Sequence, residues 1–211
     1  LIPLISTLNS DKYFECDVSK SASDLDSIEN MFEKISKVWN EIDFIVHALA
    51  YSDKEELKGK YINCSRENFL NSLDISAFSF TRIAKSSFPL MSLKGGTLLT
   101  LSYLGAERTT PNYNVMGVAK SALEASIKYL AMDLGKKNIR VNALSAGPVK
   151  TLAGAAISGA RHVFRDSESV APLKFNPQLK EVGNAALYLT SELSSGVTGN
   201  VHHVDGGLHS V

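Results

Sequence analysis

Short apolar runs recur along this sequence, separated by longer amphipathic segments, and this alternation restricts the possible folds more than any other feature. The runs lie near residues 13–17, 42–49, 97–102, 140–145 and 200–204. Continuously apolar strands are typical of parallel sheets that are covered on both faces. Their alternation with helices predicts an α/β protein built on a doubly wound parallel sheet of the Rossmann type.

The composition fits one domain without a strongly charged partner. With 211 residues and 44% hydrophobic content, residues 1–211 can bury one substantial core. The 22 basic and 22 acidic residues balance, so no net charge draws the chain to nucleic acid or an anionic membrane. No apolar run approaches the ~20 residues that span a bilayer, and no signal-peptide pattern is present. Cys16 and Cys64 are isolated, which favours unpaired thiols in a reducing compartment, so we expect a cytoplasmic protein.

The stretch from Leu98 to Lys120 gathers the residues best suited to chemistry. An apolar strand is followed by Tyr103, and Tyr113 and Lys120 then occur within a helical pattern. Ligands of parallel α/β sheets bind at the carboxyl ends of the strands. Seven helical residues turn through ~700°, which would place Tyr113 and Lys120 on one face about 10 Å apart along the axis. We therefore expect both side chains to reach one ligand.

A lysine ammonium beside a tyrosine hydroxyl favours the phenolate and makes the hydroxyl a better proton donor or oxyanion stabiliser. The same ammonium can hydrogen-bond a sugar diol. The spacing alone is weak evidence, because a core tyrosine and a solvated lysine produce it by chance. The position of Tyr113 and Lys120 after a strand, with Tyr103 on the preceding loop, favours the catalytic interpretation.

Three longer segments carry a resemblance to a known family: LTLSYLGAERTTPNYNVMGVAKSALEAS, IRVNALSAGPVKTLA and GVTGNVHHVDGG. From Cys16 onward, the chain resembles the enoyl-acyl carrier protein reductases of type II fatty acid synthesis, a divergent branch of the short-chain dehydrogenase/reductases. Six residues separate Tyr113 from Lys120, whereas an ordinary short-chain dehydrogenase places three residues there. This spacing is similar to that of the enoyl reductases rather than the carbonyl reductases.

The resemblance implies roles for these residues in reducing a trans-2-enoyl thioester on acyl carrier protein, with NADH more favoured than NADPH. Tyr113 would hydrogen-bond the enolate, Lys120 would hold the nicotinamide ribose, and Tyr103 would line the acyl side and assist protonation. Further cofactor contacts would come from Asp17, Val18, Leu49, Gly147, Val149, Thr151 and Ala153, and Ser52 would contact the substrate.

The residues themselves leave alternatives at several of these positions. Asp17 can equally cap the turn that follows it. Around Gly147, the bare motif is only a turn in which glycine permits close backbone approach. His47, in an apolar strand, is typical of a core histidine. His202 and His203 are adjacent on a strand and point to opposite faces, so we predict no metal site.

The resemblance also implies features of the whole assembly. We expect the first βαβ segment of the fold, with its glycine-rich turn, to be missing from this chain. The helical stretch over residues 65–91 would pack against a partner subunit in a homotetramer. Residues 151–172 are rich in alanine and serine, and such a segment of low stability is a candidate substrate lid.

Two other functions stay open at this stage. One is a carbonyl reductase that acts on 3-oxoacyl thioesters, which shares the fold and the tyrosine–lysine chemistry. The other is a non-catalytic nucleotide-binding relative that keeps only the fold. The joint presence of Tyr113 and Lys120 speaks against the second.

Overall fold

The computed structural model of the chain describes residues 10–19, 27–151 and 160–211. The main elements in chain order are α2 (Ile28–Ser36), β1 (Phe44–His47), α3 (Arg66–Leu73), α4 (Ser79–Met91), β2 (Gly96–Ser102), α5 (Val115–Leu134), β3 (Ile139–Ala146), α7 (Ala160–Val170), α8 (Leu179–Thr190) and β4 (Val201–Val204). Shorter helical turns lie at Tyr61–Asn63, Asp74–Phe78, Leu104–Ala106, Gly135–Lys137, Glu192–Ser194 and Leu208–Ser210.

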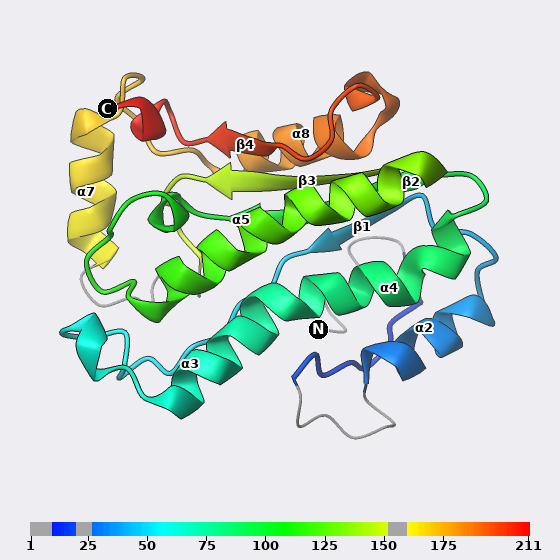
Figure 1. The fold of residues 1–211 in the computed structure, drawn as a ribbon. Helices are drawn as coiled ribbons and strands as arrows, with labels where there is room; N and C mark the ends of the chain where they lie inside the picture. The colour runs from blue at the N-terminus through cyan, green and yellow to red at the C-terminus, as the bar shows by residue number, and fades with distance from the viewer. Residues whose placement is uncertain (1–9, 20–26, 152–159) are drawn as a thin grey trace.

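The strands form one parallel sheet in the order β1-β2-β3-β4. At its centre, Leu98 of β2 lies opposite Ile45 of β1 and Val141 of β3. Parallel neighbours need a crossover connection, and helices supply it here between each strand and the next (Figure 1). The carboxyl ends of the strands therefore share one edge of the sheet, which is where a ligand site is expected.

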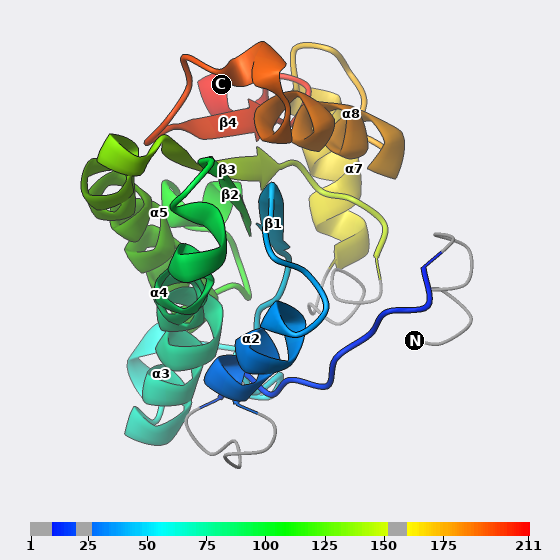
Figure 2. The same ribbon diagram turned by 90° about the vertical axis from the view of Figure 1, so that its right-hand side faces the viewer.

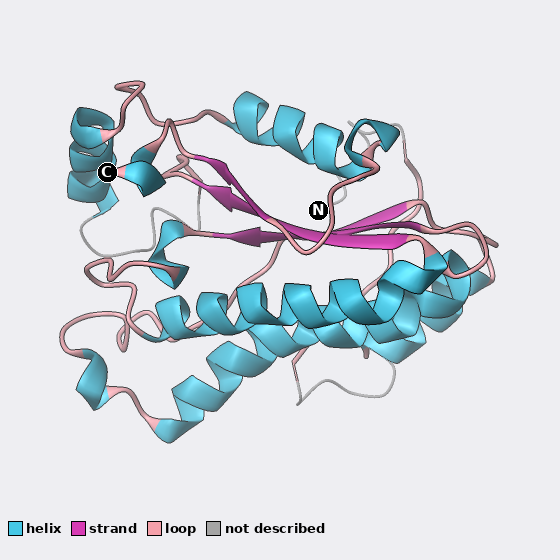
Figure 3. Ribbon diagram, turned by 45° about the horizontal axis from the view of Figure 1, so that its top comes forward, coloured by secondary structure: helices cyan, strands magenta, loops and turns pink. Residues whose placement is uncertain are grey.

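Helices cover both faces of the sheet, which confirms the predicted Rossmann-type α/β architecture. Figure 3 shows α8 on one face and α4 and α5 on the other. Because successive strand residues point to opposite faces, Leu98 packs toward Leu123 and Ile127 of α5, whereas Leu99 packs with Leu189 of α8. The two apolar clusters thus hold β2 rigidly between helices, and β2 leads directly into the predicted catalytic stretch.

The predicted helical stretch over residues 65–91 is α3 and α4 joined by a π-helical turn at Asp74–Phe78. Such a turn shifts the helix face by one residue. Ser76 within it accepts a hydrogen bond from the backbone of Tyr51, at 2.9 Å. Ser79, just after it, contacts His47 Nε2 at 2.8 Å. His47 is buried and its Nδ1 also contacts Thr100 Oγ1 at 2.8 Å, which confirms the interpretation as a core histidine.

The predicted strand at residues 13–17 is wrong. Residues 10–19 form no strand, and Figure 2 shows them passing beside α2, outside the sheet. The apolar side chains of this segment, Phe14, Cys16 and Val18, pack instead against a cluster that includes Phe32 of α2. The alternating apolar side chains that suggest a strand are here buried against a helix.

The predicted lid comprises residues 151–172, and its carboxyl-terminal part contains α7. The rest of that segment, residues 152–159, lies outside the described residues, as does the predicted cofactor contact Ala153. Among the helices that the structure describes, none is both long and apolar enough to cross a bilayer.

Candidate active site

The aromatic residues of the predicted site converge on a loop between β2 and α5. Tyr103 directly follows β2, and its ring centroid lies 5.0 Å from that of Tyr113, with the planes at 67°. This edge-to-face arrangement is a favoured geometry for two aromatic rings. Tyr113 belongs to an apolar cluster that also contains Leu57 and Met116. The structure therefore brings the two predicted tyrosines together in one apolar environment.

Tyr113 is not on the helix, and the helical projection that related it to Lys120 does not apply. It lies in a turn, and α5 begins at Val115. Its neighbours Asn112 and Asn114 have φ values of 59° and 40°, a region that breaks a right-handed helix and that asparagine tolerates better than most residues. The loop, rather than helical periodicity, thus sets the direction of the Tyr113 side chain.

Side-chain and glycine contacts hold this loop in place. Asn114 Nδ2 donates to the carbonyl oxygens of Leu57 at 3.0 Å and Gly59 at 3.3 Å. Gly105 lies against the Tyr113 ring so closely that a β-carbon there would come within 2.4 Å of Tyr113 Cδ1. Glycine is therefore required at residue 105 to leave room for the ring.

Burial governs the proton affinity of Tyr113. The side chain is 8% exposed, and burial raises the pKa of its hydroxyl, with smaller contributions from Tyr103 and Glu124. The expectation that Lys120 would favour the phenolate is thus wrong, because desolvation penalises the charged form. Tyr113 keeps its proton at neutral pH and is a hydrogen-bond donor.

Lys120 is buried on α5, and burial lowers its pKa to about 8, opposed by the charge of Glu124. Roughly nine-tenths of such a group is protonated at pH 7. Its Nζ donates to the carbonyl oxygen of Leu101 at 2.7 Å. An ammonium carries three N–H donors, so two remain beyond this bond within the part of the chain that the structure describes. Such donors fit the diol of a ribose at the end of β2.

Glu124 is a site residue that the sequence reasoning missed. It follows Lys120 by one helical turn, and Ser102 at the end of β2 donates a hydrogen bond to its carboxylate. Burial raises the pKa of Glu124, while Ser102 and Lys120 oppose this shift. Its charge acts on Lys120 and on Tyr113 alike. The four-residue spacing to Lys120 was a visible signal for this pair.

Several predicted cofactor contacts lie on loops after the strands. Leu49 follows β1 and is half-buried, and Val149, also half-buried, and the exposed Thr151 follow β3. Gly147 N donates to the carbonyl oxygen of Val204 at 2.8 Å. A β-carbon at Gly147 would lie 2.9 Å from Asp205 Cα. The glycine therefore allows the turn after β3 to pack against the chain that leaves β4.

Other predicted residues have local partners. The Asp17 carboxylate accepts a hydrogen bond from the backbone N–H of Ser19 at 2.8 Å, as expected if Asp17 caps the turn that follows it. Val18 lies in the same loop and packs against α2. Ser52 Oγ lies 3.2 Å from Nδ2 and 3.3 Å from Oδ1 of Asn68, a buried residue of α3. These contacts fix the conformation of Asp17 and Ser52.

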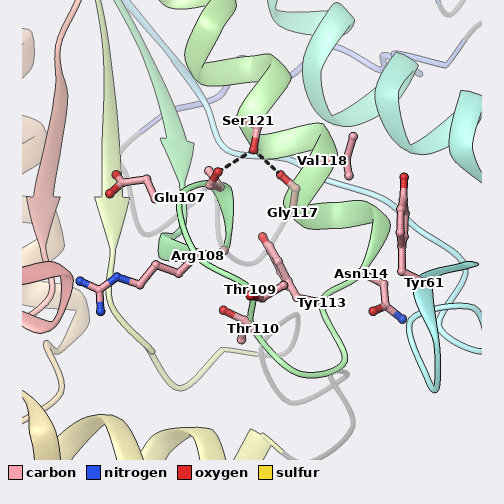
Figure 4. A pocket seen from close by; sticks show the side chains of 12 residues that line it. Tyr61, Glu107, Arg108, Thr109, Thr110, Tyr113, Asn114, Gly117, Val118 and Ser121 are labelled. Carbon is pink, nitrogen blue, oxygen red and sulfur yellow. Dashed lines mark hydrogen bonds between the residues drawn. The ribbon is translucent and has the colours of Figure 1, made fainter. Parts of the chain in front are cut away.

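A pocket of about 290 Å³ is lined by this loop and the start of α5, and Tyr113 is the one predicted catalytic residue among its lining residues (Figure 4). Ser121 of α5 lines the pocket, and its hydroxyl hydrogen-bonds the carbonyl oxygens of Ala106 at 2.6 Å and Gly117 at 2.9 Å. The lining residues are Tyr61, Gly105, Ala106, Glu107, Arg108, Thr109, Thr110, Tyr113, Asn114, Gly117, Val118 and Ser121. One side of the loop that carries Tyr113 therefore borders this pocket.

A parallel Rossmann-type sheet with a buried tyrosine and a buried lysine at its carboxyl edge defines the class of short-chain dehydrogenase/reductases. Comparison with known proteins gives the family within that class. Residues 2–209 match the family model described as enoyl-(acyl carrier protein) reductase. The chain belongs to this family.

Named relatives and solved structures agree with this assignment. The chain is 53% identical over 209 residues to enoyl-[acyl-carrier-protein] reductase [NADH] 1 of Rhizobium meliloti (strain 1021), covering 99% of this chain and 75% of that protein. A crystal structure of the reductase from Anaplasma phagocytophilum in complex with NAD is 50% identical, with a TM-score of 0.91, and covers 100% of this chain and 76% of that one. The crystal structure of FabI from Candidatus Liberibacter asiaticus is 50% identical, with a TM-score of 0.94 and coverages of 99% and 79%.

Proposed function

We propose that this chain reduces the trans-2 double bond of enoyl thioesters carried by acyl carrier protein. The observation that carries the proposal is the buried, protonated hydroxyl of Tyr113 at the carboxyl edge of the sheet, in a chain of this family. A buried neutral phenol is suited to donate a hydrogen bond to an oxygen that becomes negative during the reaction. NADH, when bound, supplies the hydride.

Tyr113 acts at the thioester oxygen. As a hydride reaches the β-carbon of the substrate, the electron pair of the double bond shifts toward the carbonyl and leaves an enolate oxygen. A donor placed there stabilises charge that exists only as the reaction proceeds, which lowers the barrier by ~2–4 kcal/mol. Tyr103, in edge contact with Tyr113, lines the acyl side and assists protonation of the α-carbon. Ser52 contacts the substrate.

Lys120 holds the cofactor ribose through its remaining N–H donors and adds positive potential beside the developing enolate. Glu124, tied to Ser102, positions the ammonium. The other cofactor contacts are proposed at Asp17, Val18, Leu49, Gly147, Val149, Thr151 and Ala153. NADH is favoured over NADPH in this proposal because the relative from Rhizobium meliloti is named for NADH.

We also propose that the chain acts as a cytoplasmic homotetramer and that residues 151–172 form a substrate lid within its single domain. The wide spacing of Cys16 and Cys64, without a C-x-x-C pair, supports a reducing compartment. Exposed apolar residues on α5, Tyr129 and Met132, support contact with a partner subunit. Ala171, just after α7, is buried against Leu104, and this contact gives the lid a fixed end beside the catalytic loop.

The test compares two thioester substrates with NADH as the reductant. We expect consumption of NADH with crotonyl and longer trans-2-enoyl thioesters, and none above background with 3-oxoacyl thioesters. The opposite preference would select the carbonyl reductase instead. Saturable NADH binding by calorimetry without turnover of either substrate would select a non-catalytic nucleotide-binding protein.

A further inference from the structure

A second cluster of ligand-type side chains lies where the chain leaves β4. His203 is on β4, Asp205 follows it, and His209 is on the 3₁₀ turn Leu208–Ser210. One ligand atom from each of the three residues lies within 4.8 Å of the others. The cluster is separate from the tyrosine–lysine pair, and the proposed reduction assigns it no role.

The hydrogen bonding of His203 leaves one ring nitrogen as a bare acceptor. Its Nε2 lies 3.2 Å from Glu107 Oε1, and a carboxylate can only accept, so this nitrogen carries the proton. Nδ1 is then a lone-pair acceptor. It is buried with no hydrogen-bond partner in the described structure, and a carboxylate oxygen of Asp205 is 4.0 Å away. The lone pair of His203 Nδ1 thus has no donor of its own, and a cation placed between it and the carboxylate would satisfy it.

Asp205 is held rigidly with its carboxylate toward both histidines. Its Oδ1 accepts from Gly207 N at 2.9 Å and its Oδ2 from His209 N at 2.8 Å. Gly206 and Gly207 have φ values of 67° and 86°, which turn the chain back so that His209 returns to the carboxylate. The Nδ1 atom of His209 lies 3.0 Å from Asp205 Oδ2. The imidazole rings of His203 and His209 stack with centroids 4.0 Å apart.

We propose that His203, Asp205 and His209 bind a divalent transition-metal ion of the zinc type. The ligands are Nδ1 of each histidine and a carboxylate oxygen of Asp205, a His₂-carboxylate set of the kind that zinc uses, with a fourth position left for water. Glu107 is the outer carboxylate that holds the Nε2 proton of His203 and orients its ring, a common partner of metal-bound histidines.

Coordination requires the His209 ring to rotate out of its stack with His203, because a metal ion lies in the plane of each imidazole and two rings stacked at 16° with centroids 4.0 Å apart share no such position. Metal–ligand lengths of about 2.0–2.1 Å place tetrahedral ligand atoms ~3.4 Å apart, and the separations from Asp205 Oδ2 are 3.0 Å to His209 and 4.0 Å to His203. The side chain of His209 is 38% exposed, so its ring can rotate. Binding displaces the Nδ1 proton of His209 to solvent, because a coordinating imidazole nitrogen must be unprotonated.

The sequence prediction of no metal site considered only His202 and His203. That argument holds for this pair, because the His202 ring lies toward Tyr188 of α8 at a centroid distance of 6.1 Å. It overlooked His209, which follows Asp205 by four residues. The adjacent His202 therefore provides a matched control for the metal site.

The experiment is a calorimetric titration of the chelator-treated chain with Zn²⁺. We expect one ion per chain, and at least a tenfold weaker affinity in His203→Gln and in His209→Gln, with His202→Gln unchanged. Asp205→Asn also removes one of the two backbone hydrogen bonds that the carboxylate accepts in the turn, so the histidine variants decide the question. X-ray absorption at the zinc edge should show only nitrogen and oxygen ligands near 2.0–2.1 Å.

Three results would overturn the metal site. The first is no saturable heat with Zn²⁺ for the folded chain. The second is an affinity that both His203→Gln and His209→Gln leave unchanged. The third is an equal loss in His202→Gln, which would assign the binding to surface histidines in general.

Discussion

The substitution Gly105→Ala perturbs the catalytic loop without removing any polar group. A β-carbon at residue 105 would lie 2.4 Å from Tyr113 Cδ1, whereas ordinary contact begins at 3.4 Å. The ring of Tyr113 must therefore move by about 1 Å, the difference between these distances. Misplacing a catalytic group by 1 Å costs on the order of 10²-fold in rate, and overpacking of this kind destabilises a fold by about 1–3 kcal/mol. We expect turnover to fall about a hundredfold in a chain that still folds.

Steady-state reduction of an enoyl thioester measures the effect of Gly105→Ala, and thermal unfolding separates it from loss of the fold. The matched control is Gly135→Ala, because residue 135 has φ −58° and a β-carbon there meets nothing within 4 Å. The control should keep wild-type turnover. Wild-type turnover in Gly105→Ala would show that the position of the Tyr113 ring does not matter to the reaction.

Two further predictions concern the cofactor and the lid. Lys120→Ala should weaken NADH binding, and Lys120→Arg should restore part of it if charge is the main requirement. Because the Lys120 pKa is about 8, calorimetric NADH affinity should fall as pH rises through about 8 and the ammonium loses its proton. The Lys120→Arg variant should lack this fall, and wild-type affinity in Lys120→Ala would reverse the assignment. Hydrogen exchange over residues 151–172 should slow when cofactor and an enolate-mimicking phenol are both bound, and less with cofactor alone. Equal protection in the free and ternary states would make the segment part of the rigid scaffold.

The sheet was predictable because β2 and β3, at its centre, are short and largely apolar segments that are buried on both faces, while the edge strands β1 and β4 are less buried. The segment at Phe14, Cys16 and Val18 has a similar pattern, yet it packs on α2. Local periodicity reports that a segment has an apolar side, and only the tertiary structure decides which surface that side meets.

The site was predictable in its residue types but not in its electrostatics. Tyr113 and Lys120 were found from spacing and resemblance, whereas the positive φ values at Asn112 and Asn114 that end the helical pattern appear only in the structure. Burial also raises the pKa of the Tyr113 hydroxyl where the sequence predicts a preference for the phenolate, because desolvation penalises the charged form. Glu124 had a visible spacing to Lys120, but its burial beside Ser102 depends on the packing of α5 against β2.

The hydroxyl of Tyr113 is tested most directly by Tyr113→Phe, which keeps the ring contact with Tyr103 and removes only the donor. A transition-state hydrogen bond worth ~2–4 kcal/mol predicts a fall in turnover of more than tenfold, with calorimetric NADH affinity nearly unchanged. Tyr13→Phe, at a tyrosine that is 59% exposed and lies outside the proposed site, should retain wild-type turnover as the control. Wild-type turnover of the enoyl thioester by Tyr113→Phe would contradict the assignment of the enolate contact to this residue.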